Sequence, residues 1–283
     1  MEATQFQVLR QLPDAGSITL EGEQAGEGPP VVLLHGLSAT RRHVVQGSRA
    51  LVQRGYRLIS YDARGHGASS AAPRYVYSDL VADLEAVLER LELERAALVG
   101  SSMGAATAMA FTLEHPERVP ALVQITPAYT GYARTGDVDG EVWQRLATAL
   151  DGGVDEFVRV AQPEGLPERW RAVAREATRQ RMERHEHLDA VGQALREIPH
   201  SVAWKGLEPL SSLEVPVLII GSQDDADAIH PLGVAQEYSR KLPHAELVVE
   251  DKGDSPLAWQ GARLSNAIAD FFERVGYPPL RQN

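Results

Sequence analysis

Short, continuous apolar runs recur along most of the chain. Runs of this length are typical of the central strands of a parallel sheet, because those strands are buried on both faces. Ahead of them, FQVLRQ (6–11) and SITLEG (17–22) alternate apolar and polar residues on either side of PDAG, which predicts two further strands around a turn. The continuous runs are VVLLH (31–35), YRLISYD (56–62), AALVGS (96–101), ALVQITP (121–127), PVLIIGS (216–222) and AELVVED (245–251).

Helical patterns fill the intervals between most of these runs. In SDLVADLEAVLERL (78–91) the apolar positions fall on one helical face, and Ser78 is the expected N-cap. A second helix, MGAATAMAFTLEH (103–115), should end at Pro116, and two more are expected at 231–242 and at about 258–274. This alternation predicts an α/β fold in which helices cover both faces of a mostly parallel, twisted sheet.

One region departs from the alternation. From about Thr130 to Gly206 the chain shows polar and charged helical patterns and no convincing strand. A stretch of about 75 residues far exceeds the usual crossover between parallel strands. We therefore expect a core domain made of residues 1–129 and 207–283, with residues 130–206 inserted as a helical cap (lid). The alternative is that these residues form ordinary peripheral helices.

Composition and charge argue against several classes of partner and of chemistry. The 283 residues carry a formal net charge of −11, which argues against a nucleic-acid partner, and the chain lacks a basic cluster suited to a membrane surface. Its apolar runs are too short to span a bilayer, and no secretory signal is recognisable at the start, so a cytoplasmic location is expected. Without cysteine, thiolate nucleophiles and cysteine-based zinc sites are excluded.

The segment LVGSSMGAATA (98–108) carries the clearest chemical signal. Ser102 stands between Gly100 and Gly104, where a predicted strand turns directly into a predicted helix. Such a turn is sharp, and glycines on either side remove the Cβ atoms that would collide with neighbouring backbone. The serine hydroxyl would then project above the carboxyl end of the sheet, where ligands of open parallel sheets bind. The pattern predicts a nucleophilic serine.

Three motifs together resemble the α/β-hydrolase family. They are VVLLHG (31–36), the D-x-R-G-H-G-x-S pattern of DARGHGAS (62–69), and GSSMG (100–104), in the family's order and spacing. The resemblance covers nearly the whole chain and includes a cap in the family's usual place, between the strands that end near Pro127 and Ser222. It implies the α/β-hydrolase fold, with backbone N–H groups of Leu37 and Met103 as the oxyanion hole. It also implies structural roles for His35 and His66 in their loops.

The acidic residue of a catalytic triad is less clearly indicated. The family places it after the strand that follows the cap, where this chain reads GSQDDADAIHP (221–231). Counting from Gly221 selects Asp224, whereas counting back from Pro231 selects Asp227; Asp225 is a third alternative. Asp227 is slightly favoured.

The usual position of the catalytic histidine holds an aspartate. In the family this histidine follows the last strand, and the aligned residue here is Asp254, with no histidine after His244. An ordinary aspartate is too weak a base to activate serine. His230, on the acid loop, is the leading replacement. Three histidines of the predicted cap are further alternatives: His185, His187 and His200. A third possibility is that Asp254, with a raised pKa, takes part in unusual acid–base chemistry.

The leading hypothesis is a carboxylesterase-like serine hydrolase acting on a small, apolar ester. The alternatives are a protein that has lost the complete triad and binds a small molecule or a partner, or catalyses a non-hydrolytic reaction, and a protein in which Asp254 is an engineered substitution. Neither a G-x-G-x-x-G after the first strand nor a Walker A sequence occurs, so no cofactor is expected. A metal bound by the DDAD sequence and His230 is a weaker alternative to a solvated loop, and the sequence leaves the oligomeric state open.

Overall fold

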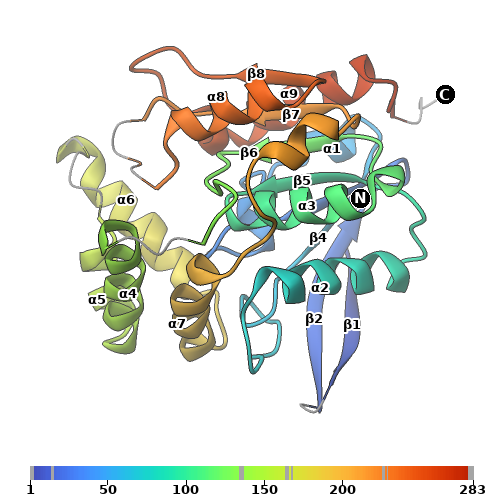
Figure 1. Ribbon diagram of the computed structural model, residues 1–283. Helices are drawn as coiled ribbons and strands as arrows, with labels where there is room; N and C mark the ends of the chain where they lie inside the picture. The colour runs from blue at the N-terminus through green and yellow to red at the C-terminus, as the bar shows by residue number, and fades with distance from the viewer. Residues whose placement is uncertain are drawn as a thin grey trace.

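Within the described residues, eight strands form a single sheet in the order β1-β2-β4-β3-β5-β6-β7-β8 (Figure 1). The computed structural model describes residues 3–13, 16–133, 137–162, 166, 168–224, 227 and 229–279. Strands β3 to β8 pair in parallel, while β1 and β2 form an antiparallel hairpin whose second strand joins β4. The strands are β1 (Thr4–Leu12), β2 (Gly16–Ala25), β3 (Pro30–Leu34), β4 (Arg57–Tyr61), β5 (Ala97–Ser101), β6 (Leu122–Ile125), β7 (Val217–Ile220) and β8 (Ala245–Val248).

Helices cover both faces of this sheet, as the alternating pattern predicts. Helices α2 (Tyr77–Arg90), α3 (Met103–Glu114) and α8 (Leu232–Lys241) share one apolar cluster with the sheet. Helices α1 (Ala50–Gln53) and α9 (Gly261–Arg274) contribute to the cluster on the opposite face. The fold is therefore the α/β-hydrolase fold expected from the sequence. Short 3-10 turns complete the chain: η1 (Arg41–His43), η2 (Pro116–Arg118), η3 (Ile198–His200), η4 (Glu208–Ser212) and η5 (Leu257–Trp259).

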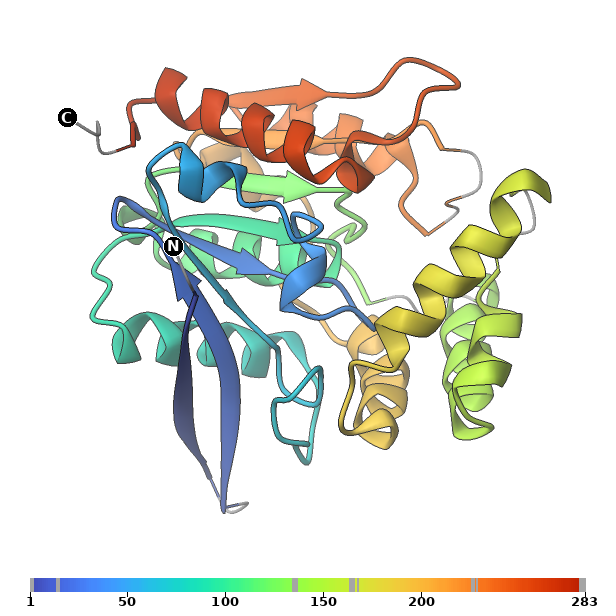
Figure 2. The same ribbon diagram turned by 180° about the vertical axis from the view of Figure 1, so that it is seen from behind.

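Residues between β6 and β7 form helices that stand beside the carboxyl ends of the strands. Figure 2 shows the arrowheads of β5 and β6 pointing towards this group. The group has an apolar cluster of its own, which includes Leu146, Phe157, Met182 and Leu195. Its function as a lid stays a prediction. The helices are α4 (Asp137–Asp151), α5 (Val154–Val160), α6 (Glu168–Met182) and α7 (Leu188–Glu197).

The predicted N-cap of α2 is wrong. The helix begins at Tyr77, and Val76 precedes it without a side-chain cap, so Ser78 lies inside the first turn. The N–H of Tyr77 donates instead to the hydroxyl of Ser201, at 3.3 Å. A distant hydroxyl thus satisfies one of the free N–H groups at the helix start, which no local pattern could have indicated.

Two buried histidines, His35 and His66, order the loops that follow β3 and β4. His35 Nε2 accepts the N–H of Ala63 at 2.9 Å, and His66 Nε2 accepts the N–H of Ser38 at 3.4 Å. The Nδ1 atoms of these rings lie 2.8 Å from the Gly36 carbonyl and 3.0 Å from the Arg64 carbonyl, so each Nδ1–H donates to backbone. Both imidazoles are therefore neutral and committed to main-chain partners.

His185 extends this group from the helical segment between β6 and β7. Its Nδ1 accepts the N–H of Gly67 at 2.9 Å, and its Nε2–H donates to the carbonyl of Ser38 at 3.2 Å. The N–H of Glu186 also donates to the Gly67 carbonyl, at 2.9 Å. Burial lowers the pKa of His185 to about 3 and that of His66 to about 4. These bonds tie the helices α4–α7 to the loops of the sheet.

We predict that the neutral His185 makes stability depend on pH. Its pKa is lower in the folded than in the unfolded chain, so its contribution is complete above about pH 6.5 and is lost as the pH falls towards the folded value. The largest slope is about 1.4 kcal/mol per pH unit. Urea denaturation between pH 7.5 and pH 5 should give a flatter dependence for His185→Asn than for the unaltered chain.

The matched control is His244→Asn, because the His244 side chain is 55% exposed and pairs with Glu214 at the surface. It should keep the slope of the unaltered chain. Equal slopes for His185→Asn and the unaltered chain would contradict the assignment.

Candidate functional site

Ser102 occupies the strained turn between β5 and α3. Its backbone has φ 52° and ψ −110°, a conformation that costs a non-glycine residue free energy and is often found at functional sites. A Cβ on Gly100 would lie 2.3 Å from the Gly104 carbonyl oxygen, and one on Gly104 would lie 2.2 Å from the Leu34 carbonyl oxygen. Both glycines are therefore required by the close approach of β3, β5 and α3.

The hydroxyl of Ser102 lies next to an imidazole. His230 Nε2 is 2.9 Å from Ser102 Oγ, and His230 Nδ1 is 2.7 Å from Asp227 Oδ2. Because the carboxylate of Asp227 can only accept, Nδ1 carries the proton, and Nε2 is left to accept the serine hydroxyl. Serine, histidine and aspartate thus form one hydrogen-bonded chain.

The environment of Asp227 keeps this carboxyl ionised. Burial acts to raise the pKa of Asp227, but its hydrogen bond and electrostatic interaction with His230 act in the opposite direction. The backbone N–H groups of Ile229 and His230 also donate to the carboxylate. The net result is a pKa below the ordinary value for aspartate. An ionised Asp227 can stabilise an imidazolium on His230.

Among the acidic alternatives, the structure brings Asp227 to the histidine. Asp224 lies at the start of the same loop, and its N–H donates to Ser222 Oγ at 3.1 Å. Asp225 lies outside the described residues. Asp254 is exposed after β8, and its N–H donates to the Asp251 carbonyl at 3.0 Å. Of Asp254 and His230, only His230 is hydrogen-bonded to Ser102 in the described part of the chain.

Among the described residues, the hydrogen bond from an imidazole to Ser102 Oγ is made by His230 and not by the other histidine candidates. His185 is held by the backbone contacts described above, His187 precedes α7, and His200 is exposed at the end of η3. His244 lies just before β8, at the opposite end of the strand from the loops around Ser102. His230, the leading candidate from the sequence, lies 2.9 Å from Ser102 Oγ, and its role as the base stays a prediction.

Leu37 and Met103 are the residues expected to form the oxyanion hole, and their role there stays a prediction. Met103 is the first residue of α3, so its N–H has no carbonyl within the helix to bond. The loop that carries Leu37 packs against the strand-to-helix turn at Ser102 (the elbow), since a Cβ on Gly36 would lie 3.4 Å from Ser102 Cβ. Both residues line the same pocket as Ser102.

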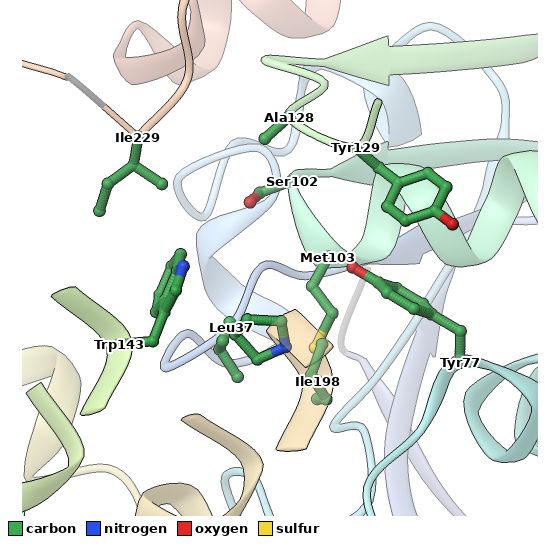
Figure 3. A pocket seen from close by; sticks show the side chains of 10 residues that line it. Leu37, Tyr77, Ser102, Met103, Ala128, Tyr129, Trp143, Ile198 and Ile229 are labelled. Atoms are coloured by element: carbon green, nitrogen blue, oxygen red, sulfur yellow. The ribbon is translucent and has the colours of Figure 1, made fainter. Parts of the chain in front are cut away.

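This pocket is lined mainly by apolar side chains and opens to solvent, and the space within it and its mouth together is about 430 Å³. Figure 3 shows the Ser102 hydroxyl directed into it, with Ile229 and Trp143 on one side and Tyr129 on the other. The Tyr129 hydroxyl donates to the Trp204 carbonyl at 2.6 Å and accepts the Ala203 N–H at 3.1 Å, so Tyr129 offers mainly its ring. The lining comprises Leu37, Tyr77, Ser102, Met103, Ala128, Tyr129, Trp143, Ile198, Pro199 and Ile229.

The sequence patterns did not indicate most of these lining residues. Trp143 belongs to α4, and Ile198 and Pro199 belong to η3, more than 40 residues further along. In the sequence they are ordinary apolar positions of helical segments. Their common location depends on how the segment between β6 and β7 folds over the sheet, which no local pattern encodes.

Two kinds of feature are absent from the described residues: a membrane-spanning helix and a cluster of metal ligands. No described helix combines the length and apolarity that a membrane span requires. Likewise, groups of three or more histidine, aspartate or glutamate side chains arranged to hold a metal are absent from the part of the chain that the structure describes.

Comparison with known proteins agrees with this architecture. The model of a family described as "alpha/beta hydrolase fold" matches residues 29–261. The AB hydrolase superfamily protein YisY of Bacillus subtilis is 28% identical over 270 residues, covering 90% of this chain and 95% of YisY.

Two solved structures show the same fold. A thermophilic esterase from Thermogutta terrifontis superimposes with a TM-score of 0.77 at 24% identity, over 96% of this chain and 99% of the esterase. The enol-lactonase from Burkholderia xenovorans LB400 gives a TM-score of 0.75 at 21% identity, over 90% of this chain and 97% of the lactonase.

The packing at the elbow yields a prediction on stability. Gly104→Ala places a Cβ against the backbone of β3, so we expect a loss of about 3 kcal/mol or more, at the upper end of overpacking effects. Gly233→Ala is the matched control, because a Cβ there meets nothing within 4 Å and alanine favours the helix. Urea denaturation should show the first variant strongly destabilised and the second unchanged or slightly more stable; equal effects would contradict the close approach.

Proposed function

The chain belongs to the alpha/beta hydrolase fold family, and on that premise we propose that it is a serine hydrolase of small, apolar carboxylic esters. The observation that carries the proposal is the hydrogen-bonded chain from Ser102 through His230 to Asp227, at 2.9 and 2.7 Å. A hydroxyl, a neutral imidazole and an ionised carboxylate in this order are the groups that nucleophilic ester hydrolysis needs.

In the acylation step, Ser102 Oγ attacks the ester carbonyl carbon while His230 Nε2 takes the hydroxyl proton. The carbonyl oxygen becomes an oxyanion, which the N–H groups of Met103 and Leu37 stabilise. Asp227 stabilises the imidazolium through Nδ1–H. Collapse of the tetrahedral intermediate breaks the bond to the alcohol oxygen, and His230 returns its proton to the leaving alcohol.

In the deacylation step, water replaces the alcohol. His230 removes a proton from the water, whose oxygen attacks the acyl carbon, and the same oxyanion site is used again. When the bond to Ser102 Oγ breaks, the proton on His230 passes to that oxygen. The products are the free acid and the unmodified serine, with the alcohol already released.

The pocket supports a neutral, apolar substrate. None of its ten lining residues is Asp, Glu, Lys or Arg, and three of them are aromatic. A charged acyl group would lose hydration there without gaining an ion pair. An uncharged alkyl or aromatic acyl group would instead bury apolar surface against Trp143, Ile198 and Ile229.

The alternative of a binding protein without a complete triad rested on Asp254 at the usual histidine position. His230 lies within hydrogen-bonding distance of Ser102, which favours the hydrolase. The two proposals differ in whether Ser102 reacts. Labelling by a fluorophosphonate probe, lost in Ser102→Ala, supports the hydrolase; equal labelling of both proteins, or of neither, contradicts it.

We predict that His230, and not Asp254, supports hydrolysis. His230→Gln should lower kcat/KM for p-nitrophenyl butyrate by about 10³-fold or more, the range typical for loss of a triad member. Asp254→Asn is the matched control and should stay within about twofold, because Asp254 is exposed on another loop. The reverse order of effects would show that the aspartate has taken the histidine's role.

We also predict that Trp143 limits acyl length. Trp143→Ala removes an indole from the pocket, so the ratio of kcat/KM for p-nitrophenyl octanoate to that for the acetate should rise about 3- to 10-fold, within the range for hydrophobic-pocket discrimination. Trp170→Ala is the control, since Trp170 is 51% exposed on α6 and does not line the pocket. An unchanged ratio in Trp143→Ala would contradict the assignment of the pocket as the acyl site.

A further inference from the structure

The acid and the base of the proposed triad lie on one loop, three residues apart. Their hydrogen bond, between His230 Nδ1 and Asp227 Oδ2, is therefore local. A histidine on the loop after β8 would tie two loops together through the same bond. Here the bond orders the pair internally but does not anchor it to the rest of the protein. The distance from His230 to Ser102 must depend on how the loop from Gly221 to Pro231 is held.

The beginning of this loop is fastened by Glu250, two residues beyond β8. Glu250 Oε1 accepts the hydroxyl of Ser222 at 2.7 Å and the N–H of Gln223 at 2.5 Å. Gln223 Nε2 donates to the backbone carbonyl of Glu250 at 2.8 Å. Three hydrogen bonds thus join the end of β8 to the first residues of the loop.

A series of hydrogen bonds continues from this junction to the triad. Ser222 Oγ, whose hydrogen goes to Glu250, accepts the N–H of Asp224 at 3.1 Å. The Asp224 carbonyl accepts the N–H of Asp227 at 3.0 Å, and the Asp227 carbonyl accepts the N–H of His230 at 3.4 Å. A displacement of Ser222 would therefore be passed along the backbone to both the acid and the base.

The Glu250 carboxylate is a costly group to place here. Its Oε2 is buried and has no hydrogen-bond partner in the described part of the chain, and an unsatisfied buried acceptor destabilises the folded state. A residue selected for stability alone would avoid this cost. The same carboxylate accepts two donors of the loop through its other oxygen, which gives it a function in fixing the loop.

We propose that Glu250 is a positioning residue, which holds the loop bearing Asp227 and His230 so that His230 stays within hydrogen-bonding distance of Ser102. This inference rests on the proposed function for its catalytic consequence. Glu250 does not line the pocket, so its loss should alter the placement of the base more than the binding of substrate.

The test compares Glu250→Ala with Glu250→Gln. Glutamine keeps a carbonyl oxygen that can accept from Ser222 and Gln223, whereas alanine keeps neither bond. We expect kcat for p-nitrophenyl butyrate to fall at least 10-fold in Glu250→Ala with KM within about twofold, and to recover to within about threefold of the unaltered chain in Glu250→Gln. Thermal unfolding of both variants reports whether the fold is intact.

Hydrogen exchange of the loop amides that the structure shows hydrogen-bonded gives a second readout that does not need activity. These are the amides of Gln223, Asp224, Asp227 and His230. Exchange should accelerate in Glu250→Ala and stay near the original rate in Glu250→Gln. If the unaltered chain shows no Ser102-dependent hydrolysis, the proposed function fails, and exchange alone decides whether Glu250 holds the loop. If the unaltered chain is active but Glu250→Ala keeps both its kcat and its exchange rates, the inference is overturned and the proposed function stands.

Discussion

The structure depends above all on the close contact of three backbone segments beneath Ser102. The carbonyl oxygen of Leu34 at the end of β3 lies only 2.2 Å from the position that a Cβ of Gly104 would take, and the carbonyl oxygen of Gly104 lies 2.3 Å from that of a Cβ of Gly100. This contact lets β5 turn into α3 within one residue, at a positive φ. The resulting strain is compensated by the packing of the buried strands β3, β5 and β6 around the turn.

Two further consequences follow from that contact. The turn brings the first N–H of α3 and the loop after β3 to the same pocket as the serine hydroxyl. The loops after β3 and β4 are in turn ordered by His35 and His66, each neutral and bonded to backbone on both nitrogens. His35 and His66 therefore connect these loops as uncharged imidazoles, which fits their lowered pKa values, and the proposed proton transfer is assigned to a different histidine.

The placement of the proposed acid and base on one loop changes what holds the site together. A carboxylate and an imidazole three residues apart can meet in many loop conformations, so their contact specifies little about the position of either group. The orientation of the pair towards Ser102 must therefore be set by contacts outside the pair. Hydrogen bonds between the loop and the segment just after β8 are contacts of this kind. Precision of this kind matters because proton transfer requires heavy atoms within about 3 Å of each other.

The sequence by itself determined the order of strands and helices, the elbow and its two glycines, because these follow from local periodicity and from the steric needs of adjacent residues. It also left the base among four histidines and Asp254, and the acid among three neighbouring aspartates, of which Asp225 lies outside the described residues. Only the tertiary structure decided that His230 meets Ser102, 128 residues away, and that Asp227 meets His230. It likewise decided that the Ser201 hydroxyl accepts the N–H of Tyr77 at the start of α2, and that Trp143 and Ile229 line one pocket. Apart from the local Asp227–His230 pair, these contacts join residues distant in the chain, and their geometry is set by how whole elements pack, which patterns of neighbouring residues do not specify.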